Sequence, residues 1–184
     1  MGNPDKEGTL SSHIADVYER GAKTAGHEVR RTNIGDLAFD PILHKGYRAI
    51  QELEPDLKKV QEDMAWCEHF VLVYPLWWAG TPALLKGLID RMFLPRFAFH
   101  FHKDGLGWDR MLKGRTARVI ILLKSNPILE HFMFGDFTNE VARATLGFAG
   151  FSVRITEVGN SEKLQEGDRE RLNKKIESLA NKAK

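Results

Sequence analysis

The sequence has one cysteine in 184 residues, Cys67, so an intramolecular disulfide is excluded. A lone cysteine is typical of chains that fold in a reducing compartment, which predicts a cytoplasmic location. No long apolar run is present either. The longest uncharged stretch, residues 70–85, has 16 residues and contains two prolines, whereas a membrane span needs about 20 apolar residues. No basic and apolar leader follows Met1, so we expect no membrane insertion.

Neither sign of charge dominates the chain. It has 27 Lys and Arg residues against 25 Asp and Glu residues, a net charge of +2, which argues against a nucleic-acid partner. With 42% apolar residues, the length suits a single domain, residues 1–184, whose core needs no disulfide or structural metal. His100 and His102 would share a face in an extended chain, but no third ligand accompanies them, and no metal site is predicted.

Residues 70–93 have the pattern of a strand, an aromatic loop and a helix. Phe70–Tyr74 is a short apolar run of the kind buried in parallel sheets, and Pro75 ends it because proline lacks an N–H. Thr81-Pro82 pairs a capping residue with a favoured first helical residue, so a helix is expected to begin there. Its apolar residues recur every three or four positions, which leaves three charged residues in solvent: Lys86, Asp90 and Arg91.

The loop between that strand and helix contains Pro75, Leu76, Trp77, Trp78, Ala79 and Gly80. In an open parallel sheet, ligands bind beyond the carboxyl ends of the strands, where such loops lead into helices. Two adjacent tryptophans on a surface loop are unexpected as packing alone, and a flat aromatic ligand would cover them. The alternative is that both are partly buried loop aromatics, and the two interpretations are about equally favoured.

Residues 74–91, Y-P-L-W-W-A-G-T-P-A-L-L-K-G-L-I-D-R, resemble the flavin-binding segment of the flavodoxin-like NAD(P)H:quinone oxidoreductases, the DT-diaphorase-like family. The resemblance extends to residues 36–47, 94–99, 112–118 and 144–151. It implies an α/β flavodoxin-like fold, with a parallel sheet in the order 2-1-3-4-5 sandwiched by helices. It also implies a homodimeric enzyme that binds FMN, or alternatively FAD. Such an enzyme takes hydride from NADPH or NADH and reduces a quinone or a similar flat acceptor by a ping-pong mechanism.

A polar loop, residues 2–12, runs into a helical pattern that Gly26 closes. Hydroxyls and free N–H groups at a helix start can bind an anion, although serine and threonine there are more simply explained as caps. In the family that the sequence resembles, this loop grips the flavin phosphate. The positions that match are Asn3, which stands where histidine is usual, and the hydroxyl turn Thr9, Leu10 and Ser11.

Residues 124–137, K-S-N-P-I-L-E-H-F-M-F-G-D-F, are expected to form the loop after a second buried strand, Ala117–Leu123. The resemblance implies that this loop lines the flavin ring, with Lys124, Ser125 and Asn126 as candidates for its carbonyls. The family often carries a tyrosine here that assists hydride transfer, and this loop has none. His131 is its only group that titrates near neutrality, and it is the candidate catalytic acid.

The remaining patterns complete the expected fold. They are an edge strand over His27–Ile34, two helices within residues 46–66 that break at Glu54-Pro55, a helix over Thr138–Gly147, a strand over Phe151–Val158 and a helix over Glu162–Ala183. No apolar run precedes Gly2, so the first strand of the sheet is missing from this sequence. We expect an upstream segment of about 6 to 8 residues, because the gap would leave two strands with unpaired edges.

Two further expectations concern partners. The aromatic residues of segment 97–108 are too many for a free linker, and a partner subunit is a good candidate to cover them. The unusual loop 124–137 also motivates an alternative function. In that alternative the chain is a flavodoxin-like ancillary subunit, of the kind that attaches to potassium-efflux transporters, with weak or vestigial turnover.

Overall fold

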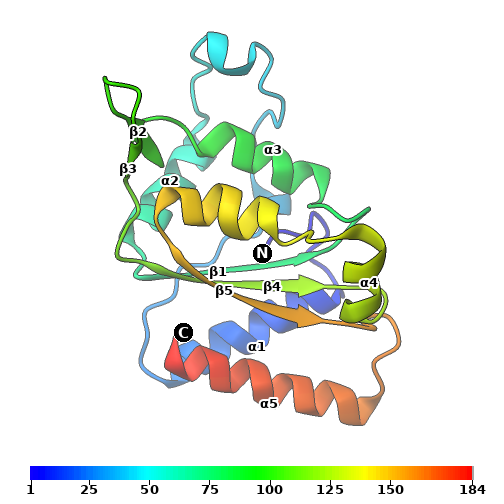
Figure 1. Ribbon diagram of the computed structural model, residues 1–184. Coiled ribbons are helices and arrows are strands. Elements are labelled where there is room, and N and C mark those ends of the chain that lie inside the picture. Colours follow the sequence, from blue (N-terminus) through cyan, green and yellow to red (C-terminus); the bar gives the residue numbers. More distant parts are fainter. Residues whose placement is uncertain (184) are drawn as a thin grey trace.

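The computed structural model describes residues 1–183 and has three layers (Figure 1). The central layer is a parallel sheet of β1 (His69–Pro75), β4 (Thr116–Leu122) and β5 (Ser152–Val158), in the order β1-β4-β5. Helices α1 (Leu10–Thr24) and α5 (Glu166–Lys182) cover one face. Helices α2 (Pro55–Trp66), α3 (Ala83–Met92) and η3 (Glu140–Gly147) cover the other. The expected flavodoxin-like α/β architecture is confirmed.

The core consists of two apolar clusters, one on each face of the sheet. Successive residues of β4 point alternately to the two faces, so Val119 and Ile121 pack under α2, α3 and η3, while Ile120 and Leu122 pack on α1 and α5. All four side chains are buried. β4 is therefore apolar on both faces, as expected of a central parallel strand.

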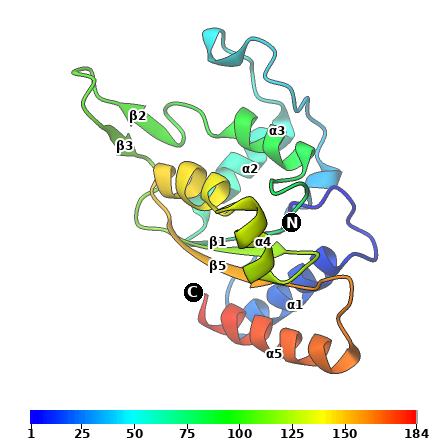
Figure 2. The ribbon, with the colours of Figure 1, turned by 45° about the vertical axis from the view of Figure 1, so that its right-hand side comes forward.

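The three strands end at the same edge of the sheet. Pro75 pairs with Leu122, and Leu122 pairs with Val158, so the segments that follow these residues all emerge together. That edge comes forward in Figure 2, with helix α4 (Pro127–Phe134) in front of it. We call this edge the rim. Ligands of open α/β sheets bind at such an edge.

Residues 27–34 do not form the expected edge strand; they run as irregular backbone into the short helix η1 (Ile34–Asp36). An edge strand needs a neighbour along its length. Among residues 1–183, only Met1 lies in that place, with its carbonyl accepting from the Ile34 N–H at 3.0 Å. The prediction failed because a strand is stabilised by pairing, which the composition of one segment does not determine.

Two other predicted elements differ. The first of the two helices expected within residues 46–66 is reduced to the short turn η2 (Gly46–Arg48), whereas the second is α2, beginning at Pro55 as expected. Tyr47 and Ile50 in this segment are exposed and bury nothing that would stabilise a longer helix. The expected loop 124–137 contains α4, for which Asn126 supplies the cap by accepting from the Ile128 N–H at 2.9 Å.

A hairpin of β2 (Phe99–Phe101) and β3 (Trp108–Arg110) projects from the domain. Several of its aromatic rings pack within the chain: Trp108 stacks on Phe148 with ring centroids 4.4 Å apart, and Phe99 meets Phe148 at 5.2 Å. Part of the surface that covers these aromatic rings therefore comes from the same chain. Among the helices of residues 1–183, none has both the length and the apolar character to cross a membrane.

Candidate functional site

The first segment at the rim is the tight turn Trp77–Gly80, which follows β1. Trp77 and Gly80 exchange both backbone hydrogen bonds at 3.0 Å, and Trp78 and Ala79 between them have positive φ angles of 52° and 56°. Two consecutive left-handed residues make this a type I′ turn, which normally uses asparagine and glycine. The left-handed conformation costs an ordinary residue roughly 1–2 kcal/mol. The turn therefore stores strain, a feature found preferentially at ligand sites.

The turn presents its indoles to solvent. Trp78 is fully exposed and Trp77 is 48% exposed, so the interpretation of these side chains as partly buried loop packing is wrong for Trp78. The turn itself is firmly placed, because the Leu76 N–H donates to the Leu122 carbonyl at 2.8 Å and ties it to the end of β4. A rigid turn that holds a bare indole at the rim offers a stacking surface for a planar ligand.

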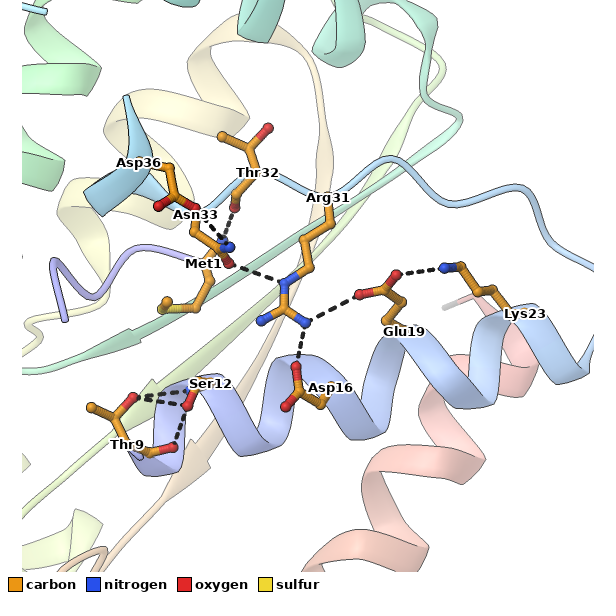
Figure 3. Close-up of polar contacts among 10 residues, drawn as sticks. All are labelled: Met1, Thr9, Ser12, Asp16, Glu19, Lys23, Arg31, Thr32, Asn33 and Asp36. Atoms are coloured by element: carbon orange, nitrogen blue, oxygen red, sulfur yellow. Dashed lines mark hydrogen bonds and ion pairs between the residues drawn. The ribbon is translucent and has the colours of Figure 1, made fainter. Parts of the chain in front are cut away.

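The second segment is the loop Gly2–Thr9 with the start of α1. The Gly2 N–H donates to the Val73 carbonyl at 2.7 Å, which joins the loop to β1. Asn3 and Ser11 are both buried, and Asn3 Nδ2 lies 3.4 Å from Ser11 Oγ, so the two residues predicted to act together do meet. Thr9 Oγ1 accepts from the Ser12 N–H at 3.1 Å and caps the helix (Figure 3). Its capping role, which the sequence favoured, is confirmed.

This helix start retains donors for an anion. The first N–H groups of a helix have no acceptor inside it. Within residues 1–183, the N–H groups of Leu10 and Ser11 donate to no other group, while that of Ser12 goes to Thr9. The loop is also tightly seated: a Cβ built on Gly35 would lie only 2.1 Å from the Pro4 carbonyl oxygen, and Lys6 pairs with Asp36. Two free N–H groups on a fixed loop fit a phosphate.

The third segment follows β4. Its polar side chains are held by neighbours: Lys124 Nζ lies 3.2 Å from Glu162, Ser125 Oγ donates to Glu130 at 2.5 Å, and Asn126 caps α4. All three residues lie at the rim, as the sequence placed them. Gly159 fixes the neighbouring loop, since a Cβ there would meet Pro127 Cδ at 2.5 Å. Contacts of these side chains with a flavin ring stay a prediction.

His131, in α4, is bound to β5. Its Nε2 lies 2.8 Å from Glu157 Oε1, and its ring stacks on Phe137 with centroids 4.4 Å apart. The hydrogen bond that His131 donates to Glu157 raises the pKa of His131, so the ring holds a proton at a higher pH than a free histidine does. The role of His131 as an acid stays a prediction.

A family profile described as flavodoxin-like fold matches residues 1–182. This chain belongs to the flavodoxin-like fold family. Its rim is therefore the carboxyl edge of a flavodoxin-like sheet, and the indole turn and the α1 loop are the two segments that flank the carboxyl end of β1.

Curated relatives of this flavodoxin-like chain are oxidoreductases by name. An uncharacterized NAD(P)H oxidoreductase of Haemophilus influenzae is 27% identical over 128 residues, 67% of this chain and 62% of that protein. Ribosyldihydronicotinamide dehydrogenase (quinone) of Rattus norvegicus is 26% identical over 161 residues, 79% of this chain and 65% of that protein. The match thus spans less than two thirds of the length of each relative.

Among solved structures, an FMN-dependent NADH-azoreductase from Bacillus anthracis in complex with FMN superposes with a TM-score of 0.74. The two chains are 20% identical, and the superposition covers 98% of this chain and 95% of that one. Identity at this level shows a common fold.

The structure adds residues at the rim that the sequence did not single out. Gly35 supports the loop Gly2–Thr9, and only its contact with Pro4, which is distant in sequence, reveals this. Glu157, in β5, raises the pKa of His131, which lies in α4. Helix α4 also leaves a group of large apolar side chains exposed: Ile128, Leu129, Phe132, Met133 and Phe134. Ile128 and Phe132 lie four residues apart, as do Leu129 and Met133, and this helical spacing was the available signal for an apolar face that needs a cover.

Proposed function

We propose that this chain is a flavin-dependent NAD(P)H oxidoreductase that binds FMN at the rim and passes two electrons to a quinone or a similar flat acceptor. The observation that carries the proposal is the pairing of a strained turn, which exposes Trp78, with a helix start whose N–H groups at Leu10 and Ser11 are unused. A planar ring that carries a phosphate would stack on Trp78 at one end and bind the α1 N–H groups with its phosphate at the other. FMN is preferred to FAD because the Bacillus anthracis azoreductase that shares this fold is FMN-dependent.

The roles of the residues follow from their positions. The α1 start and Ser11 hold the phosphate, with Asn3 fixing the Ser11 hydroxyl. Residues 75–80 form the wall for the ring, and residues 124–126 close the third side. When bound, the flavin supplies two-electron chemistry, accepting hydride from NADH or NADPH and giving it to the acceptor. The chain positions donor and acceptor in turn over the same ring face, which is the basis of ping-pong kinetics.

His131 would supply a proton to the reduced acceptor. Hydride addition to a quinone leaves an oxyanion, and a neighbouring imidazolium neutralises it by proton transfer. The hydrogen bond to Glu157 raises the pKa of His131, which favours its protonated form, and it also holds the ring in place. This role is expected to be modest, because the hydroquinone anion left by hydride addition can also take its proton from water.

We further propose that the chain acts as a homodimer. Residues 37–54, between η1 and α2, form a segment that contains η2 and that we call the excursion. The hairpin β2–β3 and the excursion project on the same side of the molecule in both views (Figures 1 and 2). Each carries exposed apolar side chains: Phe101 and Leu106 on the hairpin, Tyr47 and Ile50 on the excursion. A second subunit would cover them. A reducing compartment such as the cytoplasm suits the single thiol, Cys67.

The test is equilibrium titration with FMN followed by steady-state kinetics with NADH or NADPH and a benzoquinone. We expect FMN binding and a parallel-line pattern in double-reciprocal plots. Trp78→Ala removes the stacking surface and is expected to weaken FMN binding by roughly tenfold, since a stacked aromatic contributes about 1–3 kcal/mol. Trp66→Ala, which removes an exposed indole in α2, is the matched control. An FMN-bound protein that neither donor reduces would favour the ancillary subunit.

A further inference from the structure

A surface pocket of about 410 Å³ lies between the hairpin β2–β3 and helix η3, and we call it the hairpin pocket. Ala144 and Gly147 of η3 line it and have little or no side chain, which leaves room above the helix. Trp108 of the hairpin also lines it. Its indole stacks on Phe148 with centroids 4.4 Å apart, and its Nε1 donates to the Phe148 carbonyl at 3.0 Å. The hairpin pocket therefore has a fixed aromatic wall beside a helix surface of little bulk.

Two arginines line this pocket without an acidic partner. Arg110 lies at the end of β3 and Arg143 lies in η3, and both are exposed. Among residues 1–183, neither guanidinium forms an ion pair or a hydrogen bond, and no acidic residue lines the pocket. Arg110 is held over the Trp108 ring, with Cζ 5.7 Å from its centroid, and this contact leaves its N–H groups unused. Two such guanidiniums suit a phosphate.

Asn139 adds a third donor to the hairpin pocket. The residue is partly exposed and lines the pocket, whereas its Oδ1 is buried and accepts no hydrogen bond within residues 1–183. Of the two amide atoms, Nδ2 is therefore the one that can face a ligand, and it can only donate. Three donors without an acceptor match a phosphate group, whose oxygens accept. In addition, η3 is a π-helix, a rare form that occurs mostly at functional sites.

Helix η3 connects the hairpin pocket to the rim. Its first residue, Glu140, has Oε2 3.5 Å from Oγ1 of Thr81, which directly follows the turn Trp77–Gly80. In Figure 1 the helix, in yellow, runs from the side of α4 toward the hairpin. Its eight residues span at most about 12 Å. A dinucleotide, which has two nucleosides joined by a pyrophosphate, can therefore reach from the proposed flavin ring at Trp78 to the hairpin pocket.

We propose that the hairpin pocket binds the 2′-phosphate of NADPH through Arg110, Arg143 and Asn139, and thereby makes NADPH a better hydride donor than NADH. NADH has a hydroxyl at that position and gives the two guanidiniums no anion to bind. The proposed site for the FMN phosphate is at the start of α1, on the opposite face of the sheet, so the two phosphates do not compete. This inference rests on the proposed function, because it concerns the donor of that reaction.

The first arm of the test is kinetic. On the FMN-loaded chain, KM and kcat are measured for NADPH and for NADH with a benzoquinone as acceptor. We expect Arg110→Gln and Arg143→Gln each to raise KM for NADPH by roughly tenfold and KM for NADH by less than about twofold, with kcat little changed. Equal effects on the two donors would overturn the proposal, because the pocket would then bind a part that both donors share.

The matched control is Arg20→Gln. It removes an exposed arginine from α1, on the opposite face of the sheet, and lowers the net charge by the same amount. It should change neither KM. A rise in KM for NADPH equal to that of Arg143→Gln would assign the effect to the charge of the whole protein and contradict a site at the hairpin pocket.

The second arm needs neither flavin nor turnover. Isothermal titration compares adenosine 2′,5′-bisphosphate with 5′-AMP, which lacks only the 2′-phosphate. We expect the bisphosphate to bind the parent chain roughly tenfold more tightly than AMP, and Arg143→Gln to lose this advantage. Equal binding of the two nucleotides by the parent chain would overturn the proposal. Preference for the bisphosphate in a chain that neither donor reduces would support this pocket and contradict the proposed oxidoreductase alone.

Discussion

The buried guanidinium of Arg91 grips the carboxylate of Glu54 with both terminal nitrogens, Nη2 at 2.9 Å from Oε2 and Nη1 at 3.1 Å from Oε1. The same nitrogens also donate to the carbonyls of Asp40 and Glu52. Arg91 is 0% exposed, although the apolar periodicity of α3 predicted it to lie in solvent. Its side chain instead ties α3 to both ends of the excursion between η1 and α2.

We therefore expect Glu54→Gln to lower the free energy of unfolding by about 1–3 kcal/mol, because it leaves a buried cation with weaker partners. Asp90→Asn is the control. It breaks the ion pair in which Lys86 Nζ lies 2.7 Å from Asp90, on the same helix but in solvent, and should cost less than about 1 kcal/mol. Urea denaturation of both variants measures the difference, and equal losses would show that Arg91 does not depend on Glu54.

Ala79→Gly separates stability from function. Ala79 has a φ of 56°, which glycine adopts without penalty, so the substitution should raise the unfolding temperature or leave it unchanged. It also loosens the turn that places Trp78, so we expect weaker FMN binding, by a few-fold. Calorimetry and an FMN titration on the same samples test both. Tighter FMN binding by the glycine variant would show that the strained turn does not prepare the site.

Gly35→Ala tests whether the position of loop Gly2–Thr9, the proposed phosphate site, matters for FMN binding. The added Cβ would lie 2.1 Å from the Pro4 carbonyl oxygen, so the loop before α1 must move, and FMN affinity should fall by roughly tenfold or more. The control is Gly167→Ala, the same substitution in α5. There the added Cβ would meet nothing within 4 Å, and alanine favours the helix. Isothermal titration with FMN compares the two. Unchanged affinity in Gly35→Ala would remove this loop from the site.

His69 gives a prediction about pH. Burial, with the charges of Arg118 and His27, lowers its pKa from 6.5 to about 4, and its ring nitrogens contact the hydroxyls of Tyr18 at 3.0 Å and Thr116 at 2.7 Å. Between pH 6.5 and 4 the unfolded chain takes up this proton and the folded chain does not. The free energy of unfolding should therefore decrease as the pH is lowered from 6.5 to 4, by on the order of 2 kcal/mol.

His69→Gln removes that titration and should flatten the curve of unfolding free energy against pH between 4 and 6.5, whatever its effect at pH 7. Chemical denaturation across this range gives both curves. Parallel curves for the parent chain and the variant would show that His69 does not titrate differently on folding.

How much the sequence could predict depended on whether local chemistry decided the outcome. β1 and the start of α1 followed from an apolar run, a proline and a threonine cap, all of which act within a few residues. Helix α4 was missed although its signals were present: a capping Asn126, Pro127 after it and Gly135 at the end. The apolar residues between these signals are equally typical of a loop that lines a ligand, so the local pattern did not distinguish a helix from a loop.

The other differences depend on distant partners. Residues 27–34 have strand formers but lack a neighbour along their length, and no property of the segment reveals that. Arg91 is buried because Glu54 and two carbonyls converge on it, whereas periodicity alone assigns any charge to the surface. At the rim, the sequence named Asn3 and Ser11 together, but the support of Gly35 required knowledge of where Pro4 lies.

The most direct test of the proposed oxidoreductase is an anaerobic experiment on the FMN-loaded protein. NADH or NADPH is added first, and the flavin absorbance is followed; excess donor is then removed, and a benzoquinone is added. The proposed function predicts that one donor bleaches the flavin without any quinone and that the quinone restores the colour without any donor, as two separate half-reactions. A chain that takes up no FMN, or a bound flavin that neither donor bleaches, would contradict it.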